Sequence, residues 1–313
     1  MILVHGSNLA QKERPTAKYG DSLSHQYLKE IRIEYDKWHT ANTQLLGPTS
    51  KASDKDEALI HSRVQLFEEY KTFLDQQKYA EHFDSRSNLH SSVLEEFLYY
   101  LFRDLVADFG NQTLIGKSHS FKDIFFVAPN YKSMTARPYA SIEKKDHDFV
   151  IGVTVQAKLQ TLSQDDSEHE DLQFGEAQTD HYDVTIDGKT ETHLFDVPAV
   201  AIECKTYLDK TMLEGSSRAA DELKARNPNG LYIVVMEWLK LTEDVNLRKY
   251  KVDQIYVLRK QKNTDREFRY LPNYVKNPID SLVVQHLFTM VRDHLTSDWE
   301  GGVKHGLQRG WLL

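Results

Sequence analysis

The sequence predicts a mixed β-sheet flanked by helices, of the α/β or α+β class, with a helical region at its N-terminus. Three observations predict this fold. Apolar residues recur at helical spacing in stretches between residues 22 and 108, short β-type runs follow Gly110, and a strand–helix–strand pattern comes before a last helix. We expect a helical N-terminal region over residues 1–85 and a sheet-containing core over residues 86–313.

The composition is that of an ordinary globular protein of 313 residues with a net charge of −8. This charge argues against a polybasic nucleic-acid binder, but a DNA enzyme with a carboxylate-rich site remains compatible with it. No apolar run approaches the ~18 residues of a membrane span. The single cysteine, Cys204, excludes an internal disulfide, and the N-terminus lacks the basic lead of a signal peptide. We therefore expect a cytoplasmic protein without membrane contact.

The N-terminal region reads as a polar arm followed by helices. Residues 1–21 are polar and irregular, which indicates either a surface arm or an arm lying along a nucleic-acid backbone. Helical spacing of apolar residues then predicts helices over residues 22–39, 54–78 and 92–108.

Glu95, near the start of the third helix, has two interpretations. Ser92 and Glu95 match a capping box, in which both side chains bind free backbone amides at the helix start. Alternatively, Glu95 is a carboxylate that points at a metal site.

The core region alternates strands with turns. Asp187-Gly188 lies between two β-type runs and predicts a hairpin. Asn277-Pro278 predicts the start of the last helix. We expect strands at 113–115, 123–127, 141–155, 182–186, 190–195, 200–205, 231–236 and 254–258, and a helix at 210–225.

The strand over residues 200–205 carries the most distinctive chemistry. Residues two apart in a strand point to the same face, so Glu203 and Lys205 should lie side by side while Ile202 and Cys204 face the core. The plain interpretation is a surface ion pair. The functional one is a metal-dependent phosphodiesterase, because Mg²⁺ needs only one or two carboxylates and a lysine beside them can position water.

A second carboxylate should come from a neighbouring strand, and Asp148 is our first choice. It lies where a charged segment becomes an apolar strand, with an acidic loop and the hairpin between it and Glu203. Asp146 on the same strand and Asp183, nearer in sequence to Glu203, are the alternatives. Asp196 is nearer still, but it falls in the expected turn before Pro198.

These residues resemble a known nuclease motif. Asp148-Phe149-Val150-Ile151-Gly152, followed by Ala201-Ile202-Glu203-Cys204-Lys205, resembles the PD-(D/E)xK motif, although no proline precedes Asp148. The stretch from Glu203 to Met212, its following helix and Val235-Met236-Glu237-Trp238 are similar to the Bpu-type Type II restriction endonucleases, which cut interrupted sites of the CCTNAGC kind. The similarity runs through most of the chain, from His5-Gly6-Ser7-Asn8 onward.

The resemblance implies a restriction-endonuclease-like fold and roles for particular residues. Residues 86–313 would be the catalytic core. Asp148, Glu203 and the Cys204 carbonyl would bind Mg²⁺, Lys205 would act at the attacking water, and Glu95 would match an extra carboxylate found in this fold. Lys210 and Arg218, on the following helix, would lie near the phosphate backbone.

The implied function is Mg²⁺-dependent, sequence-specific hydrolysis of double-stranded DNA. The implied partners are a second copy of the chain or a second subunit, since a palindromic site matches a two-fold dimer and an asymmetric one does not. A cognate DNA methyltransferase would belong to the same system. The alternatives are a structure-selective or repair nuclease of the same fold, and a non-catalytic DNA-binding protein on a decayed nuclease fold.

Overall fold

The computed structural model describes residues 3–14, 18–83, 88–162, 184–187 and 189–299, together with residues 303 and 307. Within this part of the chain, a six-stranded mixed sheet has the order β1-β2-β4-β5-β6, with β3 beside β4. Its strands are β1 (Thr113–Phe126), β2 (Ala140–Gln160), β3 (Val184–Asp187), β4 (Thr190–Leu208), β5 (Leu231–Leu239) and β6 (Gln254–Lys262). The predicted class, a mixed sheet flanked by helices, is confirmed.

Helices precede the sheet, connect its strands and close the chain. The α-helices are α1 (Val4–Lys12), α2 (Ser22–Gln44), α3 (Asp56–Leu74), α4 (Gln77–His82), α5 (Ser92–Ala107), α6 (Tyr131–Ala136), α7 (Lys210–Arg226) and α8 (Ser281–Thr296). The described residues also include two short 3₁₀ helices, η2 (Leu247–Lys249) and η3 (Asn263–Phe268). No helix in the described ranges is both long and apolar enough to cross a membrane.

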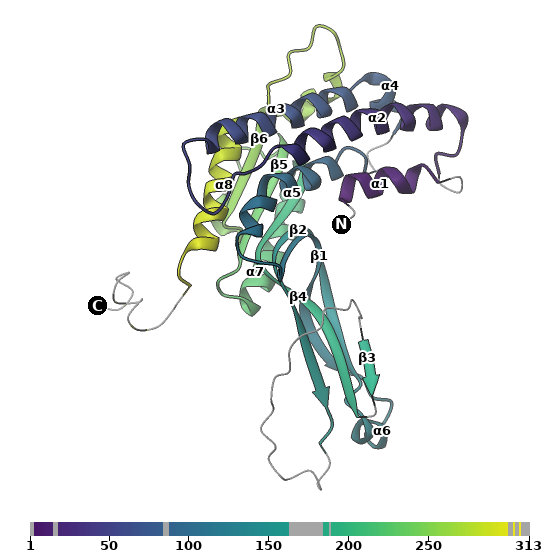
Figure 1. Ribbon diagram of the computed structural model, residues 1–313, viewed down its shortest axis with the longest axis vertical. Coiled ribbons are helices and arrows are strands. Elements are labelled where there is room, and N and C mark those ends of the chain that lie inside the picture. Colours follow the sequence, from purple (N-terminus) through teal and green to yellow (C-terminus); the bar gives the residue numbers. More distant parts are fainter. Residues whose placement is uncertain are drawn as a thin grey trace.

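The sheet has an antiparallel half and a parallel half. β2 pairs antiparallel with β1 on one side and with β4 on the other, whereas β4, β5 and β6 run parallel, with α7 as the crossover between β4 and β5. The antiparallel strands extend beyond the helical layers as a long arm, with β3 beside it and α6 near its tip (Figure 1). One continuous sheet therefore runs from the helix-flanked body of the protein into the arm.

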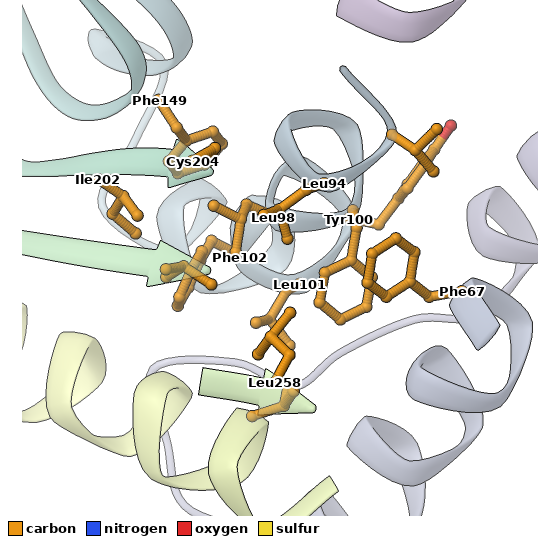
Figure 2. Packing of buried hydrophobic residues seen from close by; sticks show 14 of the residues in the cluster. Phe67, Leu94, Leu98, Tyr100, Leu101, Phe102, Phe149, Ile202, Cys204 and Leu258 are labelled. Atoms are coloured by element: carbon orange, nitrogen blue, oxygen red, sulfur yellow. The ribbon is translucent and has the colours of Figure 1, made fainter. Parts of the chain in front are cut away.

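Alternate residues of the central strands pack into two layers. Ile202 and Cys204 of β4 belong to a large apolar cluster with α5, while Ala201 packs in a second cluster with α7. Figure 2 shows Phe149, Ile202 and Cys204 directed toward Leu94 and Leu98 of α5. Burying this helix under the sheet fixes the position of its first turn relative to β2 and β4.

Several predicted strands are pieces of longer ones. The runs at 113–115 and 123–127 form one strand, β1, and the runs at 190–195 and 200–205 form β4. The sequence predicts a turn before Pro198, but this residue lies inside β4 opposite Gly152, where the register shifts by one residue. A Cβ on Gly152 would lie 2.3 Å from the Val197 carbonyl oxygen, so glycine permits this close approach.

The expected N-terminal arm is instead the helix α1. His5 and Leu9 are fully buried, and the His5 backbone N–H donates to Glu96 Oε2 at 2.9 Å. The His5 ring also bonds with Ser92 Oγ at 2.9 Å and Tyr70 Oη at 2.7 Å. The prediction of an irregular surface arm is therefore wrong. Tertiary contacts stabilise a helix in a segment whose helical periodicity is weak.

One further expectation changes in detail. The last helix begins after Asp280, whose side chain accepts from the Leu282 and Val283 amides, and not at Asn277-Pro278. The hairpin at Asp187 is confirmed by the pairing of Asp187 with Thr190. Most of the acidic loop and the last residues of the chain lie outside the described residues.

Candidate functional site

β4 presents an acid and an amine on one face, as predicted. Ile202 and Cys204 are buried in the core, and Lys205 Nζ lies 2.6 Å from Glu203 Oε1. The Cys204 thiol is buried, and its pKa is raised well above the usual value, by burial first and then by Asp148. Cys204 is therefore a core residue whose backbone, not its sulfur, reaches the site.

Asp148 on the neighbouring strand β2 contacts this pair. The β2–β4 ladder ends with Phe149 opposite Ile202, and the Asp148 side chain continues it by accepting from the Cys204 N–H at 2.9 Å. A bulge on β2 at this point sets Asp148 and Phe149 against one residue of β1, Lys117. Bulges redirect side chains, and here the carboxylate lies 3.4 Å from Lys205 Nζ.

Glu203 is held by a residue that the sequence pattern does not single out. The Tyr232 hydroxyl of β5 donates to Glu203 Oε2 at 3.3 Å, and the Tyr232 ring is fully buried. Burial and the adjacent carboxylate raise the pKa of Tyr232, which keeps its proton available for this bond. Tyr232 lies within a continuous apolar run, and its polar tip is the only sign in the sequence of such a role.

Glu95 joins the site and does not cap its helix. The N-cap of α5 is Ser91, and Ser92 Oγ donates to the Asn88 carbonyl instead of to a free amide. The capping-box interpretation is therefore wrong. Burial, and next the charge of Asp148, raise the pKa of Glu95 to about 7.

A cleft of about 600 Å³ opens at the point where β2 and β4 separate. Its walls come from α1, the start of α5, β1, β2, the end of β4, the start of α7 and η3. The lining residues are Val4, Ser7, Asn8, Gln11, Asn88, His90, Ser91, Glu95, Lys117, Asp148, Cys204, Lys205, Thr206, Tyr207, Met212 and Arg266. Glu203 is not among them, but it contacts Lys205, which is.

The cleft contains polar residues that sequence reasoning missed. Ser7, Asn8 and Gln11 come from one stripe of α1, and Arg266 comes from η3. The stripe has helical spacing, but it stays hidden as long as residues 1–21 are taken for an irregular arm. Arg266 lies far from the motif in sequence, so only the fold brings it close.

The alternative aspartates have other surroundings. Asp146 is 70% exposed and pairs with His119 at 2.5 Å, away from the cleft. Asp196 accepts from Ser118 Oγ at 2.6 Å and Thr154 Oγ1 at 2.8 Å. Asp183 lies outside the described residues. Of Asp146, Asp148 and Asp196, Asp148 is the residue that contacts Lys205.

The helix after Lys205 does not bring its basic residues into the cleft. Arg218 is 82% exposed and pairs with Glu222 of the same helix at 3.1 Å. Lys210 is exposed at the start of α7, and neither residue is part of the cleft lining. A contact of these residues with a phosphate backbone stays a prediction.

The donor set suits a hard divalent cation. Asp148 and Glu203 both contact the Lys205 ammonium, so their oxygens converge on a position that a cation already occupies. Burial and Glu203 raise the pKa of Asp148, which a metal ion would reverse. In the described part of the chain, no three acidic, histidine or cysteine side chains stand close enough to enclose a metal. Mg²⁺ tolerates this, since it commonly keeps several waters and one or two carboxylates.

The pKa of Glu95 leads to a testable pH dependence. A carboxyl group with a pKa near 7 in the folded chain and about 4.3 in the unfolded chain stabilises the fold below pH 4.3. This stability is lost as the pH rises toward 7. In EDTA, the free energy of unfolding of the wild type should fall by roughly 2–3 kcal/mol more between pH 5 and pH 8 than that of Glu95→Gln. Urea unfolding at both pH values measures the difference, and parallel pH profiles would contradict it.

The fold and the site together define a nuclease of the PD-(D/E)xK class. A model of the Bpu10I restriction endonuclease family matches residues 86–312, well over half of the chain. The chain therefore belongs to the Bpu10I restriction endonuclease family, and is a Type II restriction endonuclease, a site-specific deoxyribonuclease.

A solved structure supports the fold. The chain is similar to a structure described as the native BbvCI A2B2 tetramer, with a TM-score of 0.65 and 19% sequence identity. The match covers 94% of this chain and 98% of that one, so the restriction-endonuclease-like fold extends through the N-terminal helices. No curated protein matches the chain.

Proposed function

We propose that this endonuclease hydrolyses DNA with Mg²⁺ held at Asp148 and Glu203. The observation that carries the proposal is the convergence of two carboxylates from adjacent strands on the single ammonium of Lys205. Hydrolysis of a phosphodiester needs a Lewis acid that polarises the phosphate and a water positioned for attack. Acidic and basic groups of β2, β4 and α5 line the same cleft, where both needs can be met.

Each residue has a distinct role in this proposal. Asp148, Glu203 and the Cys204 carbonyl hold the metal, which when bound would polarise the phosphate and lower the pKa of bound water. Lys205 orients the attacking water and balances negative charge on the phosphate. Tyr232 fixes Glu203, and Glu95 adds a third carboxylate from α5.

The wider assignments rest on the family. We propose that residues 86–313 form the catalytic core and residues 1–85 a helical region that supports it. We further propose that the chain works in the cytoplasm, on an interrupted site of the CCTNAGC kind, beside a cognate DNA methyltransferase. Pairing with a second copy or a second subunit is supported by the A2B2 assembly of the similar structure.

Asp148 and Asp146 provide a matched pair of variants that tests the site. Asp148→Asn removes a proposed metal ligand and should abolish the cutting of plasmid DNA in Mg²⁺ into discrete fragments. Asp146→Asn removes a charge two residues away on an exposed side chain and should cut at the wild-type rate. Fragment patterns on gels, with and without EDTA, measure both.

Three results would count against the proposal. Full activity of Asp148→Asn would remove this residue from the site. Equal activity in Mg²⁺ and in EDTA would exclude the metal. Cutting only of branched or nicked DNA, with intact plasmid left uncut, would point to a structure-selective nuclease.

A further inference from the structure

Arg266 contributes a basic side chain to the wall of the cleft. In the described part of the cleft lining, the other basic groups besides His90 are Lys117 and Lys205. Lys205 pairs with Asp148 and Glu203, and Lys117 lies within electrostatic reach of Glu95. The described residues place no acidic side chain within salt-bridge distance of the Arg266 guanidinium.

The charges behind Arg266 increase this imbalance. A buried network next to the cleft joins four basic side chains with three acidic ones. Its members are Lys71, Arg259, Arg269, Lys276, Glu68, Asp75 and Glu237. His90 adds no charge at neutral pH, because burial and then Lys71 lower its pKa to about 3. The network is therefore positive by one charge, and Arg266 raises the excess to two.

The position of Arg266 is fixed by its neighbours. Arg269 Nη1 donates to the Arg266 carbonyl at 2.9 Å, and Arg269 Nε is itself held by Asp75 Oδ1 at 3.0 Å. Burial, and next the Arg269 guanidinium, lower the pKa of Arg266 and outweigh the opposite effect of Glu237 and Asp75. An arginine nevertheless keeps its proton in a protein. A partly desolvated cation beside a like charge gains from an incoming anion.

Arg266 also lies at a useful place relative to the carboxylates. It is within electrostatic reach of Tyr207, which lines the same cleft. Tyr207 follows Lys205 by two residues on β4, which corresponds to about 7 Å along a strand. Arg266 therefore lies near Tyr207, which is two residues beyond Lys205 on β4.

We propose that Arg266 binds a DNA backbone phosphate next to the one that is cut. This inference rests on the proposed function, and it assigns the positive wall of the cleft to the DNA backbone. Arginine suits the task because its planar fork binds phosphate oxygens in pairs. Such a contact sets the position of the DNA and carries no sequence information.

The salt dependence of DNA binding tests this proposal. Each phosphate contact releases counterions and adds about 0.9 to the slope of log K against log salt concentration. Arg266→Ala should reduce the magnitude of the slope by about 0.9 and weaken binding by about tenfold. Binding is measured on a duplex with the mapped cleavage site, with Ca²⁺ in place of Mg²⁺, for the chain in its native assembly.

Two variants serve as controls. Arg248→Ala removes an exposed arginine from η2, outside the cleft lining, and should bind with the wild-type slope. Arg266→Lys keeps the charge and should restore most of the slope. If Arg266→Ala unfolds, Arg266→Gln provides the neutral variant. A slope and affinity for the neutral Arg266 variant equal to those of Arg248→Ala would overturn the proposal.

The proposal and the proposed function can fail separately. Metal-dependent cleavage by the wild type with no change in slope for Arg266→Ala would refute only the phosphate contact. If the wild type does not cleave, the same comparison on a random-sequence duplex decides. On that duplex, a smaller salt slope for Arg266→Ala than for the wild type supports the phosphate contact, and an unchanged slope refutes it.

Discussion

Replacing Lys205 with alanine should slow metal-dependent DNA cleavage by about 10²–10³-fold, the usual effect of removing one group that stabilises charge in the transition state. Burial alone would lower the pKa of Lys205, but Asp148 and Glu203 outweigh it and raise the pKa. The side chain is therefore a cation at neutral pH, placed between two carboxylates. Its loss removes the group that would orient water and balance charge on the phosphate. Initial rates of plasmid cleavage in Mg²⁺ measure the effect.

Two controls separate this role from a general loss of structure. Lys29 is exposed on α2, outside the cleft lining, and Lys29→Ala should cleave at the wild-type rate. DNA binding by Lys205→Ala in Ca²⁺ should stay close to that of the wild type, since the change affects the reaction more than the affinity. Unchanged cleavage by a folded Lys205→Ala variant would contradict the proposed role of Lys205.

The centre of this site was predictable because it depends on local pattern. Period-two alternation in β4 separates Glu203 and Lys205 from Ile202 and Cys204. The shift of polarity at Asp148 marks the point where a strand enters the core. Neither inference needs knowledge of distant parts of the chain, and the structure brings all three polar side chains together.

The remainder of the site depends on packing between distant segments. α1 is helical because His5 and Leu9 dock against other helices, and weak local periodicity does not reveal it. Glu95 fits a capping pattern in sequence, yet burial under the sheet turns it toward Asp148. Arg266 lines the cleft because η3, which directly follows β6, forms part of the cleft wall. Local sequence carries no information on such contacts.

Local sequence pattern also fails to predict the length of the strands, for a related reason. Proline and glycine usually mark turns, so Pro198 suggests a break before residues 200–205. In the structure a bulge opposite Gly152 accommodates Pro198 within one strand. The arm formed by β1, β2 and β4 therefore continues into the part of β4 that carries Glu203 and Lys205, without the predicted turn (Figure 1).

The largest expected effect on stability comes from Glu237. This residue lies near the end of β5, and its side chain is 5% exposed. It lies 2.8 Å from Lys71 Nζ and 3.0 Å from Arg259 Nε, so it joins α3 to strands β5 and β6 of the sheet. Glu237→Ala leaves two buried cations without their shared partner. The free energy of unfolding should fall by about 3–5 kcal/mol, as measured by urea unfolding.

The exposed pair of Lys260 and Asp280 provides the control for the buried network. Lys260 is 72% exposed, and Lys260→Ala should change the free energy of unfolding by no more than about 1 kcal/mol. A similar loss in both variants would show that burial does not strengthen the Glu237 contacts. A loss well below about 3 kcal/mol for Glu237→Ala alone would show that the two cations find other partners.

The pH dependence of the Glu237 effect identifies its electrostatic origin. Burial alone would raise the pKa of Glu237, but Lys71 and Arg259 outweigh it and place the pKa below the usual value. A lowered pKa contributes stability that is complete above the pKa of the unfolded chain, about 4.3, and is lost as the pH falls further. The difference in unfolding free energy between the wild type and Glu237→Ala should therefore be constant from pH 6 to pH 8 and shrink below about pH 4. A difference that does not depend on pH would assign the effect to packing, because a cavity left by a lost side chain does not titrate.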